Sequence, residues 1–176
     1  MKVATLITVG LLTFVPSLAC ADDTLQFDGA IAVEPLANGT GTDATSQTVT
    51  RNIVRDVQPA ADPWRIAAFR AEVTAGGHIS AIGKGLVFAG GDTIGTALLL
   101  TPDGPAANIK VFATLICEPT APFTENNSQP VPLAANGSFQ IDDTLSPAPP
   151  SPCDTPVLFI RNAANLSWFA VGVPVQ

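Results

Sequence analysis

His78 is the only histidine of the chain, and it follows a Gly-Gly pair at the start of a predicted strand. Ser80 lies two residues later, and residues two apart on a strand project from the same face, so the two side chains can meet. Serine catalysis also needs a nucleophile turn and an acid that orients the histidine. The chain has no Gly-x-Ser-x-Gly sequence and no acid that we can assign to this role. We therefore predict no catalytic residue, and name His78, Glu72 and Asp92 only as a candidate polar site.

The small number of histidines and methionines in the chain excludes two kinds of metal site. Type I copper requires two histidines and a thiolate, usually with a methionine, and a histidine-based zinc site requires more than one imidazole. The chain has one histidine, and its one methionine is the initiator. Calcium needs only oxygen ligands, which Asp142-Asp143 or Asp92 with neighbouring carbonyl groups would supply, although no EF-hand spacing is present. Paired loop aspartates are usually solvated, so we predict no metal and no cofactor.

Carbohydrate chemistry would need two opposed carboxylates for hydrolysis or an exposed aromatic ring for binding. With fifteen acidic residues, some pair of carboxylates can always be imagined as the catalytic pair. The sequence does not show how far apart two such carboxylates lie in the fold. Trp64 and Trp168 are the only indoles, and Phe169 follows Trp168. Neighbours on a strand face opposite ways, so we expect one of Trp168 and Phe169 in the core and the other open to solvent. Core packing is the expectation for both tryptophans.

The first 21 residues have the layout of a secretory signal peptide. Lys2 precedes an apolar run from Val3 to Val15, and the small residues Ser-Leu-Ala-Cys-Ala end the segment. The run of about 13 residues is shorter than the roughly 20 that cross a membrane. We predict cleavage after Ala21 and a secreted or periplasmic protein. The alternative is a lipoprotein signal at Cys20, but that would want leucine at position 17, where the chain has serine.

Cleavage after Ala21 would remove Cys20 and leave two cysteines, Cys117 and Cys153. In an exported protein, two cysteines most simply form a disulfide bond. This bond would close a loop of 36 residues, which in the chain-entropy model stabilises a fold by about 4 kcal/mol. Redox-active pairs usually lie close in sequence, as in Cys-x-x-Cys. We therefore predict a structural disulfide.

The length and the charge of the chain limit the kinds of partner that it can bind. Removing 21 of the 176 residues leaves 155, enough for one domain with its own core. The formal net charge of −7 becomes −8 when Lys2 is lost, and the basic residues form no cluster. These features exclude a nucleic-acid footprint, and no second apolar stretch is long enough to span a membrane. We expect a carbohydrate or a protein as the partner.

Short apolar segments between Gly, Pro and Asn turns predict an all-β fold. Gly76-Gly77 and Asn136-Gly137 have the sequences of hairpin turns. Residues 108–117 are apolar on both faces, which suits a central strand. Eight to ten strands would form a two-sheet antiparallel sandwich with one disulfide. The expected strands cover 24–33, 64–74, 78–89, 94–100, 108–117, 131–133, 138–141, 157–161 and 166–173.

We expect one domain after the signal peptide. Residues 22–63 would supply an N-terminal strand and an irregular segment, and residues 64–176 would form the β-sandwich core. The stretch 44–63 has little regular pattern and is predicted to be a loop. Residues 146–152 contain four prolines, which lack the amide hydrogen that a strand ladder needs.

Three stretches carry a resemblance: Gly-Gly-Asp-Thr-Ile-Gly-Thr at 90–96, Val-Phe-Ala-Thr-Leu-Ile-Cys at 111–117, and Pro-Cys-Asp-Thr-Pro-Val-Leu-Phe-Ile-Arg at 152–161, followed by Trp168-Phe169-Ala170. With these, the chain from about Trp64 to Pro174 resembles a group of small secreted bacterial proteins of unknown function. The resemblance implies an exported single domain and no particular activity.

The sequence therefore favours an exported, non-enzymatic β-sandwich, acting as a binding or structural module of the envelope or the extracellular space. The alternative is a carboxylate-dependent hydrolase that acts on carbohydrate. Arg161 ends an apolar strand and is expected to pair with an acid in a structural role.

Overall fold

A computed structural model describes residues 24–34, 52–90, 94–101 and 104–175, and for residues 98–101 and 104–108 it describes the backbone alone. The described residues form strands and turns, without a helix, so none of them belongs to a helix that could cross a membrane. The strands are β1 (Leu25–Ala32), β2 (Trp64–Arg65), β3 (Ala68–Val73), β4 (His78–Lys84), β5 (Val87–Phe88), β6 (Leu98–Thr101), β7 (Gly104–Asn108), β8 (Lys110–Ile116), β9 (Asn126–Asn127), β10 (Val131–Pro132), β11 (Phe139–Thr144), β12 (Val157–Asn162) and β13 (Trp168–Pro174).

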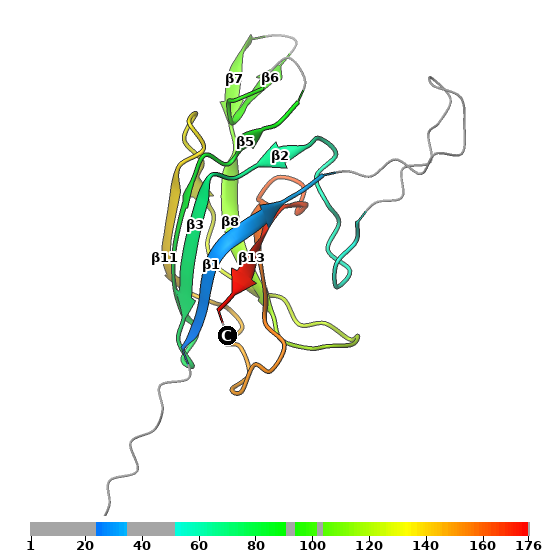
Figure 1. Cartoon of the computed structure of the whole chain (residues 1–176), viewed down its shortest axis with the longest axis vertical. Helices are drawn as coiled ribbons and strands as arrows, with labels where there is room; N and C mark the ends of the chain where they lie inside the picture. The colour runs from blue at the N-terminus through cyan, green and yellow to red at the C-terminus, as the bar shows by residue number, and fades with distance from the viewer. Residues whose placement is uncertain (1–23, 35–51, 91–93, 102–103, 176) are drawn as a thin grey trace, which may run out of the picture.

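Nine of these strands form one curled antiparallel sheet (Figure 1). The order is β10-β8-β12-β13-β1-β3-β4-β11, and β9 adds to β8. Two small sheets, β2-β5 and β6-β7, lie beyond this path. The all-β class and the antiparallel pairing are confirmed. The division into two facing sheets is not confirmed, because the nine strands are continuous through their hydrogen bonds.

The two edges of the curled sheet meet at a seam, where the chain that carries β9 and β10 runs beside β11. Asn127 and Ser146 exchange two backbone hydrogen bonds, of 3.0 and 2.9 Å, at one end of the seam. At the other end the Ala134 N–H donates to the Ser138 carbonyl at 3.0 Å. The sheet therefore wraps around its own apolar face, which becomes the core.

The alternation read from the sequence places β3 and β4 correctly. Phe69, Ala71 and Val73 are buried on β3, while Arg70 and Glu72 are exposed. β4 has the same two-residue period over His78–Lys84. One side of each strand faces the core and the other faces solvent, as a half-buried sheet requires. The predicted turn at Gly76-Gly77 joins these two strands, which pair in register.

The expectation that 108–117 is a central strand with both faces covered is also confirmed. β8 pairs with β12 along its length, and all its residues from Val111 to Ile116 are buried. The irregular segment from Asn52 to Ala60 pairs with the start of β13 through a parallel bridge between Pro59 and Trp168, and it adds Val57 and Ala60 to the core. The Trp168 N–H donates to the Gln58 carbonyl at 2.8 Å, and the Ala60 N–H donates to the Trp168 carbonyl at 3.0 Å.

This segment explains why Trp168 and Phe169 are both buried, although the sequence predicted one of them in solvent. The Trp168 indole N–H donates to the Asn52 carbonyl at 3.3 Å, so the segment contacts the Trp168 side chain. Phe169 packs on the inner side against Trp64, with ring centroids 4.1 Å apart. The expected core packing of both tryptophans is confirmed.

Three predicted strands have different bounds or partners. The strand expected over 78–89 ends at Lys84, and the separate strand β5 begins at Val87. The strand expected from Ile94 begins at Leu98 instead. The turn at Asn136-Gly137 exists, but the strands beside it do not pair with each other: β10 pairs with β8, and β11 pairs with β4. The turn therefore joins the two edges of the curled sheet and is not the tip of a hairpin.

The predicted disulfide between Cys117 and Cys153 is confirmed, with a Cα–Cα distance of 5.0 Å. It ties the residue after β8 to the chain that leads into β12. The Thr155 hydroxyl donates to the Cys117 carbonyl at 2.7 Å and supports the same junction. Strands β9 to β11 lie within the closed loop but have sheet partners of their own. The proline segment 147–152 contains no strand and is therefore the part of the loop that depends most on this bond.

Replacing Cys117 and Cys153 together with alanine is expected to lower the stability of the oxidised protein by about 4 kcal/mol, because the unfolded chain regains the freedom of a 36-residue loop. In a domain of this size the loss corresponds to a fall in Tm of roughly 8–16 °C. Thermal unfolding followed by circular dichroism measures it. Dithiothreitol should lower the Tm of the wild type and leave the double variant unchanged. A fall of less than about 2 °C would contradict the structural role.

Gly137 is expected to tolerate no side chain, because its φ is +77° and a Cβ would collide with the Leu86 backbone. Gly137→Ala should cost more than about 2 kcal/mol. Gly29→Ala isolates the conformational part, since φ is +81° but no atom lies within 4 Å, and it should cost about 1 kcal/mol. Gly76→Ala meets neither a positive φ nor a close neighbouring atom, and it should change stability by less than about 0.5 kcal/mol. Urea unfolding of the three variants tests this order, and equal losses would refute the close packing of Gly137 against Leu86.

Candidate functional site

The candidate polar site is brought together only in part. Glu72 on β3 and His78 on β4 both project from the solvent face, where Glu72 is opposite Ser80 and His78 is opposite Thr144. The acid that contacts His78 is Asp142 on β11, with Nε2 and Oδ1 3.4 Å apart. Asp92 lies outside the described residues. The sequence did not indicate Asp142 as the partner, because that contact depends on the register between β4 and β11.

The solvent face of β1, β3, β4 and β11 is an open polar surface. Arg70 lies directly opposite Asp28 and contacts it at 3.6 Å, with both side chains well exposed. Exposed pairs of this kind contribute about 0–1 kcal/mol. A shallow hollow of about 240 Å³ beside them is lined by Asp28, Arg70 and Glu72, among others. Two carboxylates and a guanidinium therefore share this part of the surface.

The oxygen ligands considered for calcium do not converge. Asp142 and Asp143 are consecutive on β11, so their side chains leave opposite faces of the strand. Asp142 contacts His78, whereas Asp143 Oδ2 accepts a hydrogen bond from the Gln129 N–H at 2.6 Å and links the two sides of the seam. Within the part of the chain that the structure describes, no three His, Cys, Asp or Glu residues are grouped as metal ligands.

Arg161 on β12 is the buried charge of the structure, with a side chain only 4% exposed. Its Nη1 contacts Glu125 Oε2 at 2.7 Å and donates to the Thr114 hydroxyl at 3.2 Å. Its Nε donates to the Leu166 carbonyl at 2.8 Å. The guanidinium also lies 5.3 Å from the centre of the Phe112 ring. The expected pairing of Arg161 with an acid is confirmed, and the contacts join two strands and two loops.

A second arginine holds the irregular segment against β8. Arg55 Nη1 donates to the Ile116 carbonyl at 2.8 Å, from a two-residue turn in which both Arg55 and Asp56 have positive φ. Burial lowers the pKa of Arg55, and the nearby Glu118 partly offsets this. Burial acts to raise the pKa of Glu118, but hydrogen bonds from backbone N–H groups, including that of Thr124, outweigh it and hold the pKa below its ordinary value.

A hollow of about 500 Å³ opens where β1 separates from the chain that leads into β3. The two chains are paired at Asp28 and Arg70, and they meet again where the Trp64 N–H donates to the Val33 carbonyl at 3.0 Å. A register shift after Phe27 accompanies the positive φ of Gly29. The hollow is lined by Ala30, Ile31, Ala32, Glu34, Asn52, Trp64, Arg65, Ile66 and Trp168. We call it the β1–β2 hollow.

The lining of the β1–β2 hollow combines apolar and charged groups. Ile31 is 68% exposed, an unusual position for a large aliphatic side chain on a strand. Both indoles line the hollow but are only 3% exposed, so they offer no ring face for stacking. The side chains of Glu34 and Arg65 form no hydrogen bond or ion pair with another described residue. The site can therefore accept an apolar group and bind polar groups at its rim.

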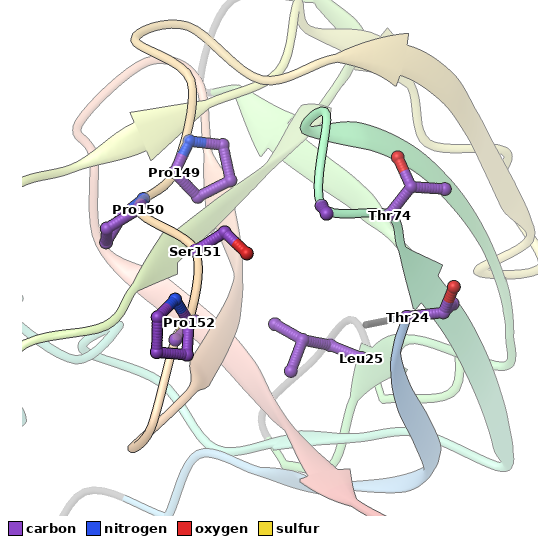
Figure 2. A pocket seen from close by; sticks show the side chains of 9 residues that line it. Thr24, Leu25, Thr74, Pro149, Pro150, Ser151 and Pro152 are labelled. Atoms are coloured by element: carbon purple, nitrogen blue, oxygen red, sulfur yellow. The ribbon is translucent and has the colours of Figure 1, made fainter. Parts of the chain in front are cut away.

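A smaller groove lies at the other end of β1 (Figure 2). Its volume is about 210 Å³, and its lining comes from the start of β1, the β3–β4 turn and the proline segment. Leu25 projects from β1 toward Ser151 and Pro152 across the groove (Figure 2). We call it the proline groove; it is lined by Thr24, Leu25, Thr74, Ala75, Pro149, Pro150, Ser151, Pro152 and Cys153.

Removing the charge that Arg161 contacts is expected to destabilise the protein. Glu125→Gln should cost about 1–3 kcal/mol, because a guanidinium with little access to water keeps only neutral acceptors. Asp28→Asn is the matched control: it removes the partner of the exposed Arg70 and should cost less than about 1 kcal/mol. Urea unfolding of both variants at neutral pH measures the difference. Equal effects would show that the Arg161 contacts contribute no more than a surface pair.

No family model matches this chain, and no curated protein or solved structure is significantly similar to it.

Proposed function

We propose that the protein is an exported, non-enzymatic β-sandwich module that binds a protein partner through the β1–β2 hollow. Export is supported by the signal-peptide layout of residues 1–21 and by the disulfide, since disulfides persist in oxidising compartments. The resemblance to small secreted bacterial proteins points the same way. The hollow is lined by residues of β1, which is a central strand of the continuous sheet, and by residues of β2.

The observation that carries the proposal is the exposure of Ile31 at the rim of the β1–β2 hollow. Burying a large aliphatic side chain stabilises a complex by about 1.5–3 kcal/mol, so an isoleucine that is two-thirds exposed beside a concave surface is a suitable contact for a partner. Arg65 and Glu34 line the same hollow and bring a guanidinium and a carboxylate that can bind polar groups of a partner. The volume of about 500 Å³ also falls within the range of about 300–1,000 Å³ typical of ligand pockets.

A protein partner suits the hollow better than a carbohydrate does. Sugar rings are commonly held against an exposed aromatic face, and the two indoles here are covered by the chain. The exposed apolar side chains near the hollow are aliphatic: Ile31 on β1 and Ile53, which follows the lining residue Asn52. Aliphatic contacts next to an arginine and a carboxylate are typical of an interface with an apolar centre and a polar rim.

Hydrolysis of a carbohydrate by two carboxylates remains the alternative, and it would use a different place. The β1–β2 hollow is lined by one carboxylate, Glu34, whereas the mechanism requires two. Asp28 and Glu72 share the shallow hollow beside Arg70 and are the pair that favours this alternative. Polysaccharide hydrolysis by the mature protein that Glu72→Gln abolishes would establish it.

Random peptides displayed on phage and selected on the oxidised mature protein are expected to yield binders that share an apolar residue. Ile31→Lys should weaken their binding at least 10-fold, since a charge replaces the apolar contact. Both tryptophans of the chain line the hollow, so the same peptides should change the tryptophan fluorescence of the wild type. The fluorescence titration gives Kd for each variant.

Ile82→Lys is the matched control, because Ile82 is 48% exposed but lies on β4, away from the hollow. It should leave peptide affinity unchanged. Peptides that bind the Ile31→Lys and wild-type proteins equally would overturn the proposed site. A fluorescence change with cell-wall oligosaccharides, without any peptide selected, would identify a carbohydrate ligand instead of a protein.

A further inference from the structure

The proline groove is separate from the β1–β2 hollow, and its wall is built in an unusual way. The segment 147–152 carries no strand, yet it forms one side of the groove (Figure 2). The chain is held before this segment, where the Leu145 N–H donates to the Gly77 carbonyl at 2.8 Å and Ser146 is bonded to Asn127. It is held after the segment by the disulfide of Cys153 and by the hydroxyl of Thr155.

The wall packs directly on the turn between β3 and β4. A Cβ placed on Gly77 would lie 2.8 Å from Pro149 Cδ, so only glycine lets the proline ring come this close. Prolines have a fixed φ and lose little side-chain entropy on binding. The groove is therefore preformed, which removes part of the cost that a ligand would otherwise meet.

The chemistry of the lining selects an uncharged ligand. None of the nine lining residues is ionisable, since Cys153 is in the disulfide. Leu25 and the prolines supply apolar surface, and Thr24, Thr74 and Ser151 supply hydroxyl groups that can donate or accept hydrogen bonds. Burying a charge without a partner is costly, so an ionic ligand of the same size would be rejected.

We propose that the proline groove is a second binding site, for a small uncharged apolar molecule that bears a hydroxyl group, and that the Cys117–Cys153 disulfide assembles it. The size of the groove, about 210 Å³, restricts the occupant to a molecule of about one ring. Reduction removes the covalent anchor after the proline segment and leaves only the hydrogen bond of the Thr155 hydroxyl. The site is then competent only in the oxidised protein, that is, after export.

This dependence has a reciprocal consequence. If the ligand binds only the oxidised form, it must also oppose reduction of the disulfide, because the two equilibria are linked. Reduction by dithiothreitol transfers two electrons and two protons to the Cys117–Cys153 bond, giving two thiols, and dithiothreitol closes to its cyclic disulfide. A ligand at ten times its Kd shifts this equilibrium 11-fold toward the oxidised protein. The 11-fold shift corresponds to a reduction potential more negative by about 31 mV.

The experiment uses benzyl alcohol as the probe, with benzoate and benzylamine as charged molecules of similar size. Amide NMR shifts near Thr24, Thr74 and Ser151 give Kd on the oxidised mature protein. The reduction potential is then measured against dithiothreitol with and without benzyl alcohol at ten times Kd. We expect the 31 mV shift with the alcohol and at least 10-fold weaker binding of both charged molecules.

Two variants locate the effect. Ala75→Leu places a larger side chain at the groove and should abolish the NMR shifts and the change in potential. Ala164→Leu, at an exposed position in the turn between β12 and β13, should leave both unchanged. A change in potential below about 5 mV, equal binding of the charged molecules, or an unaltered response in Ala75→Leu would each overturn the proposal. A change in tryptophan fluorescence with benzyl alcohol would also overturn it, by placing the molecule in the β1–β2 hollow. Failure of the peptide selection leaves these results unaffected.

Discussion

A single antiparallel sheet can remove one face from water only if it curls back on itself. The core of this molecule depends on that closure, because the described chain has no helix that could cover a flat sheet. The inner face supplies the core, from Phe27 on β1 to Phe159 on β12. The two edges meet at the seam, where a few backbone bonds and the carboxylate of Asp143 join them. An edge that is covered in this way is also protected from pairing with other chains.

Closure leaves two kinds of place where the chain is not fully packed. One is where neighbouring strands separate, as β1 and the chain before β3 do around the β1–β2 hollow. The other is the end of the curled sheet, where the proline segment crosses beside Leu25. Both candidate sites touch β1, one at each end of that strand. A register shift in β1 lies next to the first, and the disulfide lies next to the second.

Local patterns predicted much of this architecture. The alternation in β3 and the doubly apolar β8 follow from spacing along the chain, and the pairing of Cys117 with Cys153 follows from the two cysteines that remain after the predicted cleavage. The structure confirms all three. Contacts between distant segments were not readable in the same way. The Asn136-Gly137 turn looked like a hairpin tip because its local chemistry is that of a tight turn, whereas the partners of the flanking strands are decided by the curl of the whole sheet. Phe169 was not recognised as a core residue because Trp64 lies 105 positions earlier.

The candidate sites were harder to predict than the fold, because they depend even more on contacts between distant segments. His78 and Glu72 stood out by residue type, but the strands place them on an open surface where His78 contacts Asp142. The residues that line the β1–β2 hollow are common types such as Ala30 and Ile66, and only the separation of two strands brings them together. Ile31 illustrates the physical reason. An isoleucine on a strand is expected to be buried, and its exposure becomes evident only when the bulge after Phe27 changes which side chains of β1 face outward. A function that depends on an exposed aliphatic residue such as Ile31 leaves no signature in composition or in motif spacing. It becomes visible only when the course of the strands and their bulges is known.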